Sequence, residues 1–244
     1  MLYYLCIDDT DNLETKGTGW LAEQACTEMK ELGLGSFSAI SRHQLFVHED
    51  VPYTSHNSSM CVEVTDCGEP EALIRYMQDF LERNGAPGSD PGLCLVPETL
   101  CDEARERLIR FGNDAKCTVL NKGLAYGLAA ELGVHLSEHG GTGDGVVGAL
   151  AGVGLRMGGE DGRYRGWMHL GPEDTAMPAG DIARLCGAHH VQDEADHALA
   201  DEAPVLLRER IKLIRRHGLP VLLARPDETG GAMRLLHKNE LKIY

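Results

Sequence analysis

The stretch Leu2-Tyr3-Tyr4-Leu5-Cys6-Ile7-Asp8-Asp9-Thr10-Asp11-Asn12 joins an apolar run to a crowd of carboxylates. Residues 2–7 are aromatic and aliphatic and end in polar turn residues, which is typical of a buried strand. Asp8, Asp9 and Asp11 repel one another, so they require an offsetting positive charge. Hard cations such as Mg²⁺ prefer one or two carboxylates and leave other positions to water and phosphate. The pattern therefore predicts a magnesium site. A polar turn, whose Asp and Asn side chains cap backbone amides, is the alternative.

Composition limits the class of protein. The 244 residues are 43% hydrophobic, enough for one large domain or two small ones. The net charge of −15 disfavours nonspecific adhesion to nucleic acids or anionic membranes and favours small substrates. The eight cysteines form no CxxC pair and have mostly apolar neighbours, so we expect reduced thiols in a cytoplasmic protein. There is no signal-peptide pattern, and the longest apolar tract, residues 146–155, is broken by glycines, so we expect no membrane span.

Helical and strand patterns alternate after the first strand. The predicted helices span residues 18–32, 69–83, 97–111, 123–132 and 144–157, and the predicted strands span residues 37–48, 59–65 and 117–120. Residues 50–58 and 84–92 are expected to form loops. The fold class is α/β (α+β), with mixed sheets, packed helices and ferredoxin-like elements, including a possible inserted unit around residues 66–116.

The sequence changes character beyond residue 171. Residues 189–202 hold five carboxylates and no Lys or Arg, and a basic helix is predicted over residues 206–217. Short strands are predicted over residues 220–224 and 233–237. We therefore expect a boundary near residues 171–180. A first domain would span residues 1–175, and a small C-terminal α/β or barrel-like appendage would span residues 176–244.

Two glycine-rich turns precede predicted helices. Lys16-Gly17-Thr18-Gly19 follows the first strand, where helix N-terminal amides attract phosphate; a turn with Thr18 as the helix N-cap is the alternative. His139-Gly140-Gly141-Thr142-Gly143-Asp144-Gly145 is a candidate anion nest, and a hinge or tight turn is its alternative. Neither is a Walker A loop. Lys122 precedes another predicted helix and can place a point charge on a phosphate, unless it is an ordinary surface lysine.

These motifs resemble those of a known family. The run from Ile7 to Asn12, the pair Gly17-Thr18 and the run Gly143-Asp144-Gly145-Val146-Val147-Gly148-Ala149-Leu150-Ala151 look like the kinase-type domain of archaeal tRNA-isoleucine agmatidine synthetase. That family uses ATP and magnesium to phosphorylate the anticodon cytidine before agmatine replaces the phosphate. The resemblance implies that Asp8, Asp9 and Asp11 hold magnesium and triphosphate, and that Thr18 occupies the place of the autophosphorylated threonine. Matching islands lie within residues 1–170.

The departures from the family concern the RNA. The family continues into an OB-fold and a zinc ribbon that grip tRNA, whereas this sequence ends at Tyr244 and has no paired cysteines for a ribbon. The family's basic loop Pro-Trp-Lys-Thr-Arg-Gly-Asn corresponds here to Val51-Pro52-Tyr53-Thr54-Ser55-His56-Asn57, without Lys or Arg. Both losses remove phosphate-contacting charge. The nucleotide site is therefore expected more firmly than a tRNA substrate.

The resulting hypothesis is a magnesium-dependent, ATP-using phosphotransferase-like protein with an unknown small or RNA acceptor. Lys122 and the amides of residues 140–145 would complete the phosphate cradle. An RNA-binding or tRNA-modification accessory protein is one alternative, provided that a set of basic residues gathers on one face: Arg42, Arg208, Arg210, Lys212, Arg215 and Arg216. A non-catalytic nucleotide or metal sensor is the other. A homodimer is compatible with each of them.

Overall fold

The computed structural model describes residues 1–51, 57–228 and 230–244. Most of the predicted 50–58 loop, including the family's basic-loop position, lies outside these residues. The chain forms two compact units, Met1–Gly158 and Gly159–Tyr244. The division comes earlier than the expected stretch 171–180, because strand β7 (Arg163–Tyr164) pairs with β11 (Ile214–Arg216) of the second unit.

The first unit begins with a ferredoxin-like arrangement. Its elements are β1 (Tyr3–Asp8), α1 (Thr18–Glu31), β2 (Ser36–Phe37), β3 (Ser41–Gln44), β4 (Ser58–Thr65), α2 (Pro70–Asn84) and β5 (Gly92–Pro97). The strand order β5-β1-β4-β3 is antiparallel throughout, and β2 also pairs with β4. This is the β-α-β-β-α-β pattern of ferredoxin-like folds. The pattern therefore runs from β1 to β5 rather than over residues 66–116, because β5 lies beside β1 in the sheet.

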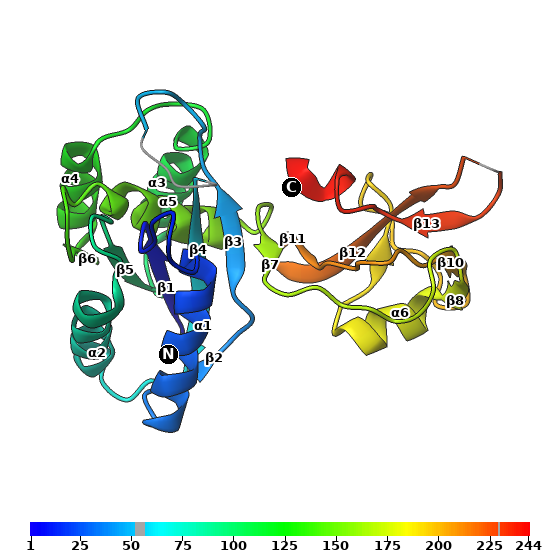
Figure 1. Ribbon diagram of the computed structural model, residues 1–244, viewed down its shortest axis with the longest axis horizontal. Coiled ribbons are helices and arrows are strands. Elements are labelled where there is room, and N and C mark those ends of the chain that lie inside the picture. The colour runs from blue at the N-terminus through cyan, green and yellow to red at the C-terminus, as the bar shows by residue number, and fades with distance from the viewer. Residues whose placement is uncertain (52–56, 229) are drawn as a thin grey trace. The chain divides into compact units, whose positions relative to one another are not determined.

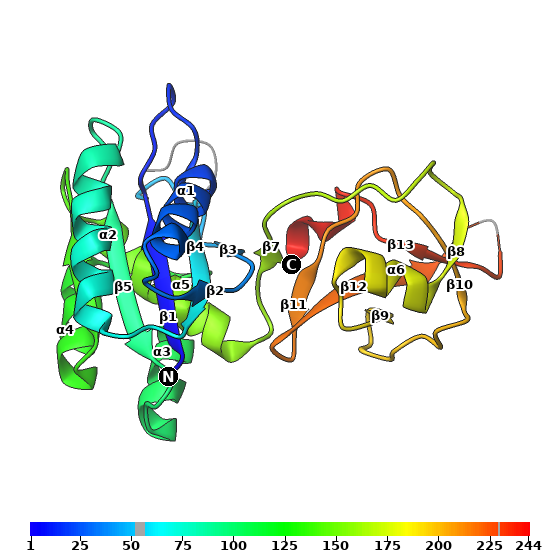
Figure 2. The same ribbon diagram turned by 90° about the horizontal axis from the view of Figure 1, so that it is seen from below.

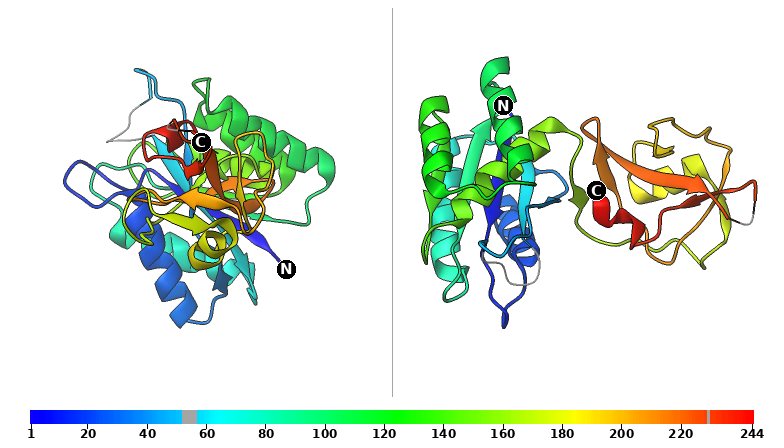
Figure 3. Two further views of the ribbon diagram at one scale, coloured as in Figure 1. Left: turned by 90° about the vertical axis from the view of Figure 1, so that its right-hand side faces the viewer. Right: turned by 90° about the horizontal axis from the view of Figure 1, so that it is seen from above.

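Helices cover both faces of this sheet (Figures 1 and 3). The later elements are α3 (Asp102–Asp114), α4 (Lys122–Leu132), β6 (His135–Glu138) and α5 (Gly145–Gly158), and β6 extends the sheet beyond β5. Alternate residues of β1 point to opposite faces: Leu5 and Ile7 join the core under α1 and α2, whereas Tyr4 and Cys6 join the core under α5 and α3. The alternation makes β1 the shared spine of two hydrophobic cores.

Small residues let α5 approach its neighbours closely. A Cβ on Gly152 would lie 2.5 Å from the Cys6 Sγ, and a Cβ on Gly154 would lie 2.0 Å from the Leu108 carbonyl oxygen of α3. Real Cβ contacts are not that short, so these positions have no room for a side chain. The helix is almost wholly buried, which explains its nearly uninterrupted run of apolar and small residues.

The second unit is a small α/β body in which sheet pairings are both parallel and antiparallel. Its remaining elements are β8 (Ala176–Pro178), α6 (Ala179–Cys186), β9 (Val191–Gln192), β10 (Pro204–Leu206), β12 (Leu219–Pro226), β13 (Met233–Leu235) and a 3-10 helix, η1 (Glu240–Ile243). Strand β10 pairs parallel with β13 and antiparallel with β8. The buried face of α6 packs on the strands through Ile182 and Cys186 (Figure 2). The predicted mixed α/β class is confirmed.

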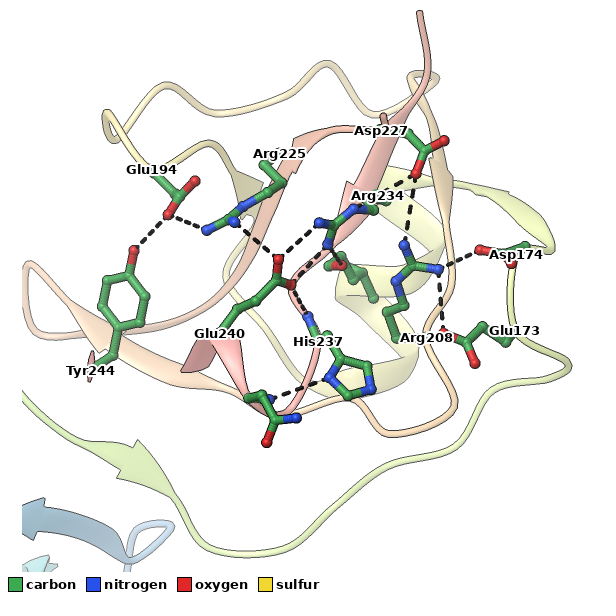
Figure 4. A network of polar contacts seen from close by, with 12 residues as sticks. Glu173, Asp174, Glu194, Arg208, Arg225, Asp227, Arg234, His237, Glu240 and Tyr244 are labelled. Atoms are coloured by element: carbon green, nitrogen blue, oxygen red, sulfur yellow. Dashed lines mark hydrogen bonds and ion pairs between the residues drawn. The ribbon is translucent and has the colours of Figure 1, made fainter. Parts of the chain in front are cut away.

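Ion pairs attach η1 to this unit (Figure 4). Arg234 donates to both carboxylate oxygens of Glu240 at 2.8 Å, and Arg225 donates to the same carboxylate at 2.9 Å. The hydrogen bonds from Arg234 hold the pKa of Glu240 at about 2, well below its ordinary 4.5. Arg225 also donates to Glu194, which accepts a hydrogen bond from the hydroxyl of Tyr244. The last residues are thereby joined to two strands and a loop.

Two element predictions were wrong. Residues 206–217 form no helix, because Ile211 bridges to Met168 and Ile214 pairs with Val221 in extended structure. Their apolar spacing resembles a helical face, yet sheet pairing determines the conformation. Residues 117–120 form a turn rather than a strand. Strand β5, strand β6 and helix α6 were not anticipated. Within the described residues, no helix combines the length and apolar character needed to cross a membrane.

Candidate functional site

Asp8, the last residue of β1, is buried against helix α5. Only 7% of Asp8 is exposed, and a Cβ added to Gly148 would lie 1.6 Å from its Oδ2. Burial raises the pKa of Asp8 to about 8, and the neighbouring charges of Asp9 and Asp11 add to the effect, whereas a backbone hydrogen bond opposes it. The absent side chain of Gly148 thus leaves the space that this carboxylate fills.

Asp9 lies where three chain segments meet. Its φ of 51° is left-handed, a conformation that Asp tolerates better than most residues. Burial raises the pKa of Asp9 to about 6, with further increases from the charges of Asp90, Asp11 and Asp144. The site therefore gathers five carboxylates: that of Asp8 at the end of β1, those of Asp9 and Asp11 after it, that of Asp90 before β5, and that of Asp144 before α5. Such a concentration of negative charge is suited to a cation.

The glycine-rich loop points backbone amides at an anion. Gly140, Gly141 and Gly143 have positive φ angles of 151°, 53° and 80°. The amides of Thr142 and Gly143 both donate to Asp90 Oδ1, the second at 3.2 Å. A Cβ on Gly141 would lie 1.9 Å from the same oxygen. The two successive amides point to one anion, which is the Asp90 carboxylate. A phosphate bound by this loop remains a prediction.

Lys122 and Asp144 border this loop. The Lys122 ammonium, on the first residue of α4, donates to the Thr142 carbonyl oxygen and lies 3.3 Å from Glu138 Oε2. The Thr142 hydroxyl donates to Asp144 Oδ2 at 2.9 Å. Gly145 opens α5, and a Cβ there would lie 2.0 Å from the Asp90 carbonyl oxygen and 3.1 Å from the Asp9 Cβ. The predicted residues of the loop therefore lie with the β1 carboxylates at one end of the sheet.

Thr18 is tied to Asp11. The Thr18 hydroxyl donates to Asp11 Oδ1 at 2.8 Å, and the Thr18 amide donates to the same oxygen at 3.2 Å. The Asp11 carboxylate thus caps the first turn of α1, the role that the polar-turn alternative assigns to it. The Thr18 hydroxyl also accepts from the Thr10 amide at 3.3 Å, and Thr18 is 5% exposed. Among the described residues, the buried Thr10 hydroxyl has no hydrogen-bond partner.

The donor set fits magnesium better than a metal held entirely by protein. Across residues 1–51, 57–228 and 230–244, no group of three or more His, Cys, Asp and Glu side chains is arranged to hold a metal ion. Mg²⁺ does not need such a group, since one or two carboxylates and substrate phosphates suffice. Asp9, together with either Asp11 or Asp90, supplies the one or two carboxylates that such a magnesium site needs.

Asp90 is the site residue that the sequence analysis missed. It lies in the loop 84–92, where nothing local distinguishes it from other turn residues. Its position follows from the register of β1 and β5, in which Asp8 pairs with Gly92. The sequence did contain a signal for Asp90, namely the apolar run Gly92–Pro97. If this run is read as a strand, the loop before it, which holds Asp90, is expected beside the ends of other strands.

The basic residues of the RNA-binding alternative do not all share one face. Arg208 pairs with Glu173 and Asp174 and has a side chain that is only 12% exposed. Arg215 is buried and donates to the Tyr164 hydroxyl at 3.0 Å. Arg216 pairs with Glu160 and Asp196. Arg42 belongs to the first unit, where it donates to Ser58.

Comparison with known proteins establishes a shared fold. No protein-family model and no curated protein matches the sequence. The structure of TiaS in complex with an isoleucine tRNA, AMPCPP and agmatine matches 74% of this chain and 43% of that chain, at 24% identity and a TM-score of 0.56. A complex of TiaS with an isoleucine tRNA and ATP matches 63% of this chain and 36% of that chain, at 24% identity and a TM-score of 0.55.

A third solved structure, a tRNA fluorescent labeling enzyme, matches 76% of this chain and 44% of that chain, at 21% identity and a TM-score of 0.55. The chain therefore spans less than half the length of each of these proteins. TiaS is an agmatidine synthetase that acts on an isoleucine tRNA. The short motifs predicted the fold of tRNA-isoleucine agmatidine synthetase, and the structure confirms this fold.

Proposed function

We propose that the chain is a magnesium-dependent, ATP-using phosphotransferase related to tRNA agmatidine synthetase. The observation that carries the proposal is the cluster at the start of α5, where Asp90 accepts hydrogen bonds from the amides of residues 142 and 143 and also raises the pKa of Asp9. Structures of the same fold were solved with ATP or AMPCPP, which supports nucleotide binding.

The arrangement explains why a metal is needed. The nest offers amides to a phosphate, but five carboxylates surround it and repel an uncompensated anion. Asp9, together with Asp11 or Asp90, would hold the magnesium ion, which would neutralise the phosphate charge. Within the chain, the amides of residues 142 and 143 would bind the phosphate once Asp90 released them, Lys122 would add a positive charge at the rim of the loop, and the N-terminus of α5 would add its dipole.

Thr18 is the proposed phosphoryl acceptor within the chain. Its hydroxyl already donates to Asp11, a carboxylate suited to receive the proton as the oxygen becomes a nucleophile. The hydroxyl is buried, so transfer requires the turn of residues 11–17 to open. The final acceptor is a small molecule or an RNA.

Isothermal titration tests the nucleotide site. We expect Mg-ATP to bind the wild type, and to bind Asp9→Asn and Gly141→Ala at least about tenfold more weakly. Asp66→Asn is the matched control, since this exposed carboxylate follows β4 at the opposite end of the sheet from Asp8 and has a positive φ that Asn tolerates. Absent binding to wild type, or equal binding to Asp9→Asn, contradicts the proposal.

Labelled ATP separates transfer from sensing. If Thr18 is the acceptor, the labelled γ-phosphate should appear on the wild-type protein and be absent from Thr18→Ala. If the acceptor is a separate molecule, the label should appear on a released product. A sensor would bind Mg-ATP with the same carboxylate dependence and leave the label on the nucleotide.

A second candidate function, RNA binding, is favoured by the charge and by two local features of the second unit. This unit holds 12 of the 23 Lys and Arg residues but 14 of the 38 Asp and Glu residues, so the acidity lies mainly in the first unit. Trp167 is 41% exposed, and the Lys212 ammonium lies 4.3 Å from its ring centroid. A depression of about 260 Å³ is lined by Glu209, Arg210, His237 and Lys238. An aromatic platform beside cations suits stacked, unpaired bases.

Fluorescence anisotropy with a single-stranded oligonucleotide tests this surface. Trp167→Ala should weaken binding by about 1–3 kcal/mol, and affinity should fall steeply with salt. Leu185→Ala, which removes another exposed apolar side chain of the same unit, is the control. Equal loss in both variants, or salt-independent absence of binding, counts against the RNA-binding function.

A further inference from the structure

A second reactive arrangement lies on edge strand β6 and on His139, the residue that joins this strand to the glycine-rich loop. The Ser137 hydroxyl lies 2.7 Å from His139 Nε2 and 2.9 Å from His135 Nε2. The other nitrogen of His139, Nδ1, lies 3.7 Å from Glu82 Oε1 of α2. We call His135, Ser137, His139 and Glu82 the serine row. In the sheet, Leu93 and Leu95 of β5 pair with Ser137 and His135, and these two leucines belong to the core under α2.

One arrangement of protons satisfies the serine row. A carboxylate only accepts hydrogen bonds, so the tautomer that suits Glu82, 3.7 Å from Nδ1, carries the His139 proton on Nδ1 and leaves Nε2 as an acceptor. The Ser137 hydroxyl then donates to His139 Nε2. Its oxygen can in turn accept from His135 Nε2. The hydroxyl proton is then directed at a base that faces a carboxylate 3.7 Å away, the same order of groups by which serine nucleophiles are activated.

The surroundings keep that base neutral and the serine accessible. Burial lowers the pKa of both His135 and His139, although Glu82 and Glu138 oppose the shift for His139. The His139 side chain is 4% exposed, whereas that of Glu82 is 64% exposed, so the row runs from the interior to the surface. Ser137 itself is half-buried. In the described part of the chain, the buried His139 Nδ1 has no partner within hydrogen-bond distance, which leaves room for the Glu82 contact to shorten when a ligand binds.

We propose that Ser137 is a nucleophilic serine that attacks carboxylic esters, with His139 as its general base and Glu82 as the group that orients His139. In this step the Ser137 oxygen bonds to the ester carbon while its proton passes to His139 Nε2. The proton then goes to the departing alkoxide, which leaves as an alcohol. Water attacks the acyl-serine by the same route and releases the acid. This activity requires neither ATP nor magnesium.

The chain contains its own matched control. Ser41 and His43 are also joined, at 2.6 Å, but both are 0% exposed. Ser41 therefore has a histidine partner of similar geometry that a reagent cannot reach. A comparison of the two serines separates activation at an accessible site from a mere serine–histidine contact.

A fluorophosphonate probe on the full-length protein tests the proposal, because the serine displaces fluoride and keeps the phosphonyl group. Peptide mass spectrometry should find the adduct on Ser137, with none on Ser137→Ala and an unchanged rate in Ser41→Ala. His139→Gln should slow labelling by about 10²-fold or more, and hydrolysis of p-nitrophenyl acetate should fall in parallel. Far-ultraviolet circular dichroism and thermal unfolding identify any variant that has lost its fold. Unlabelled wild type, an adduct on another residue, or full-rate labelling of a folded His139→Gln overturns the proposal.

Discussion

The substitution Gly148→Ala isolates the contribution of one carboxylate to the proposed phosphate site. The added methyl group would lie 1.6 Å from Asp8 Oδ2, and contacts of a real Cβ shorter than 3.0 Å are essentially never seen. The oxygen must therefore move by at least about 1.4 Å. The same methyl group would lie 2.6 Å from Asp8 Cγ, so the whole carboxylate must rotate away.

The magnitudes separate binding from stability. Alanine is favoured over glycine inside a helix by about 1 kcal/mol, which offsets part of the steric cost of overpacking, about 1–3 kcal/mol. The free energy of unfolding should therefore fall by no more than about 2 kcal/mol. A displacement of about 1 Å at a positioned group can cost about 10²-fold in activity. We therefore expect Mg-ATP affinity to fall by about 10- to 100-fold, or roughly 1.4–2.7 kcal/mol.

Titration calorimetry and urea denaturation of the same samples measure both quantities. Gly127→Ala is the control, because Gly127 is exposed in α4 and an added Cβ would meet no atom of the described residues within 4 Å. It should stabilise the protein by up to about 1 kcal/mol and leave Mg-ATP binding unchanged. Wild-type affinity in a folded Gly148→Ala variant would refute the reasoning, since Asp8 would then have no positional role.

Three further predictions concern stability. Gly154→Ala should cost about 3 kcal/mol or more in urea denaturation, because its Cβ meets a backbone oxygen that cannot step aside; a loss below about 1 kcal/mol would contradict this. Arg156→Ala should cost about 3 kcal/mol, because Arg156 is 1% exposed and donates to Glu63, Ser38 and the Ala39 carbonyl oxygen; Ser38→Ala, which removes one acceptor, should cost less. Glu240 has a folded pKa of about 2 against an ordinary 4.5, so its contribution is complete above pH 4.5 and is lost as the pH falls towards 2. Glu240→Gln should therefore lower stability by about 1–2 kcal/mol at pH 7 and flatten the dependence of the full chain's melting temperature between pH 4.5 and 2; an unchanged pH profile would exclude this role.

Local periodicity was enough to predict much of the first unit. Strand β1, helices α1, α2 and α5 and strand β4 lie within a few residues of their predicted ranges, because each carries a complete apolar face and ends in turn residues. Helix α3 begins five residues later than expected, after a Pro-Glu-Thr-Leu-Cys stretch. The run 37–48 holds two short strands, β2 and β3, rather than one.

The sequence by itself determined the chemistry of the candidate site: the acidic run that starts at the last residue of β1, the glycine loop before α5 and Lys122 at the start of α4. Tertiary structure alone decided which groups meet. Asp90 enters the nest because β5 pairs with β1, a partnership between strands more than eighty residues apart. The same holds for the stretch 206–217, where pairing with distant strands replaced a helix. Periodicity records which face of a segment is apolar, whereas the partner that covers this face, and the carboxylates brought along with it, depend on the packing of the whole unit.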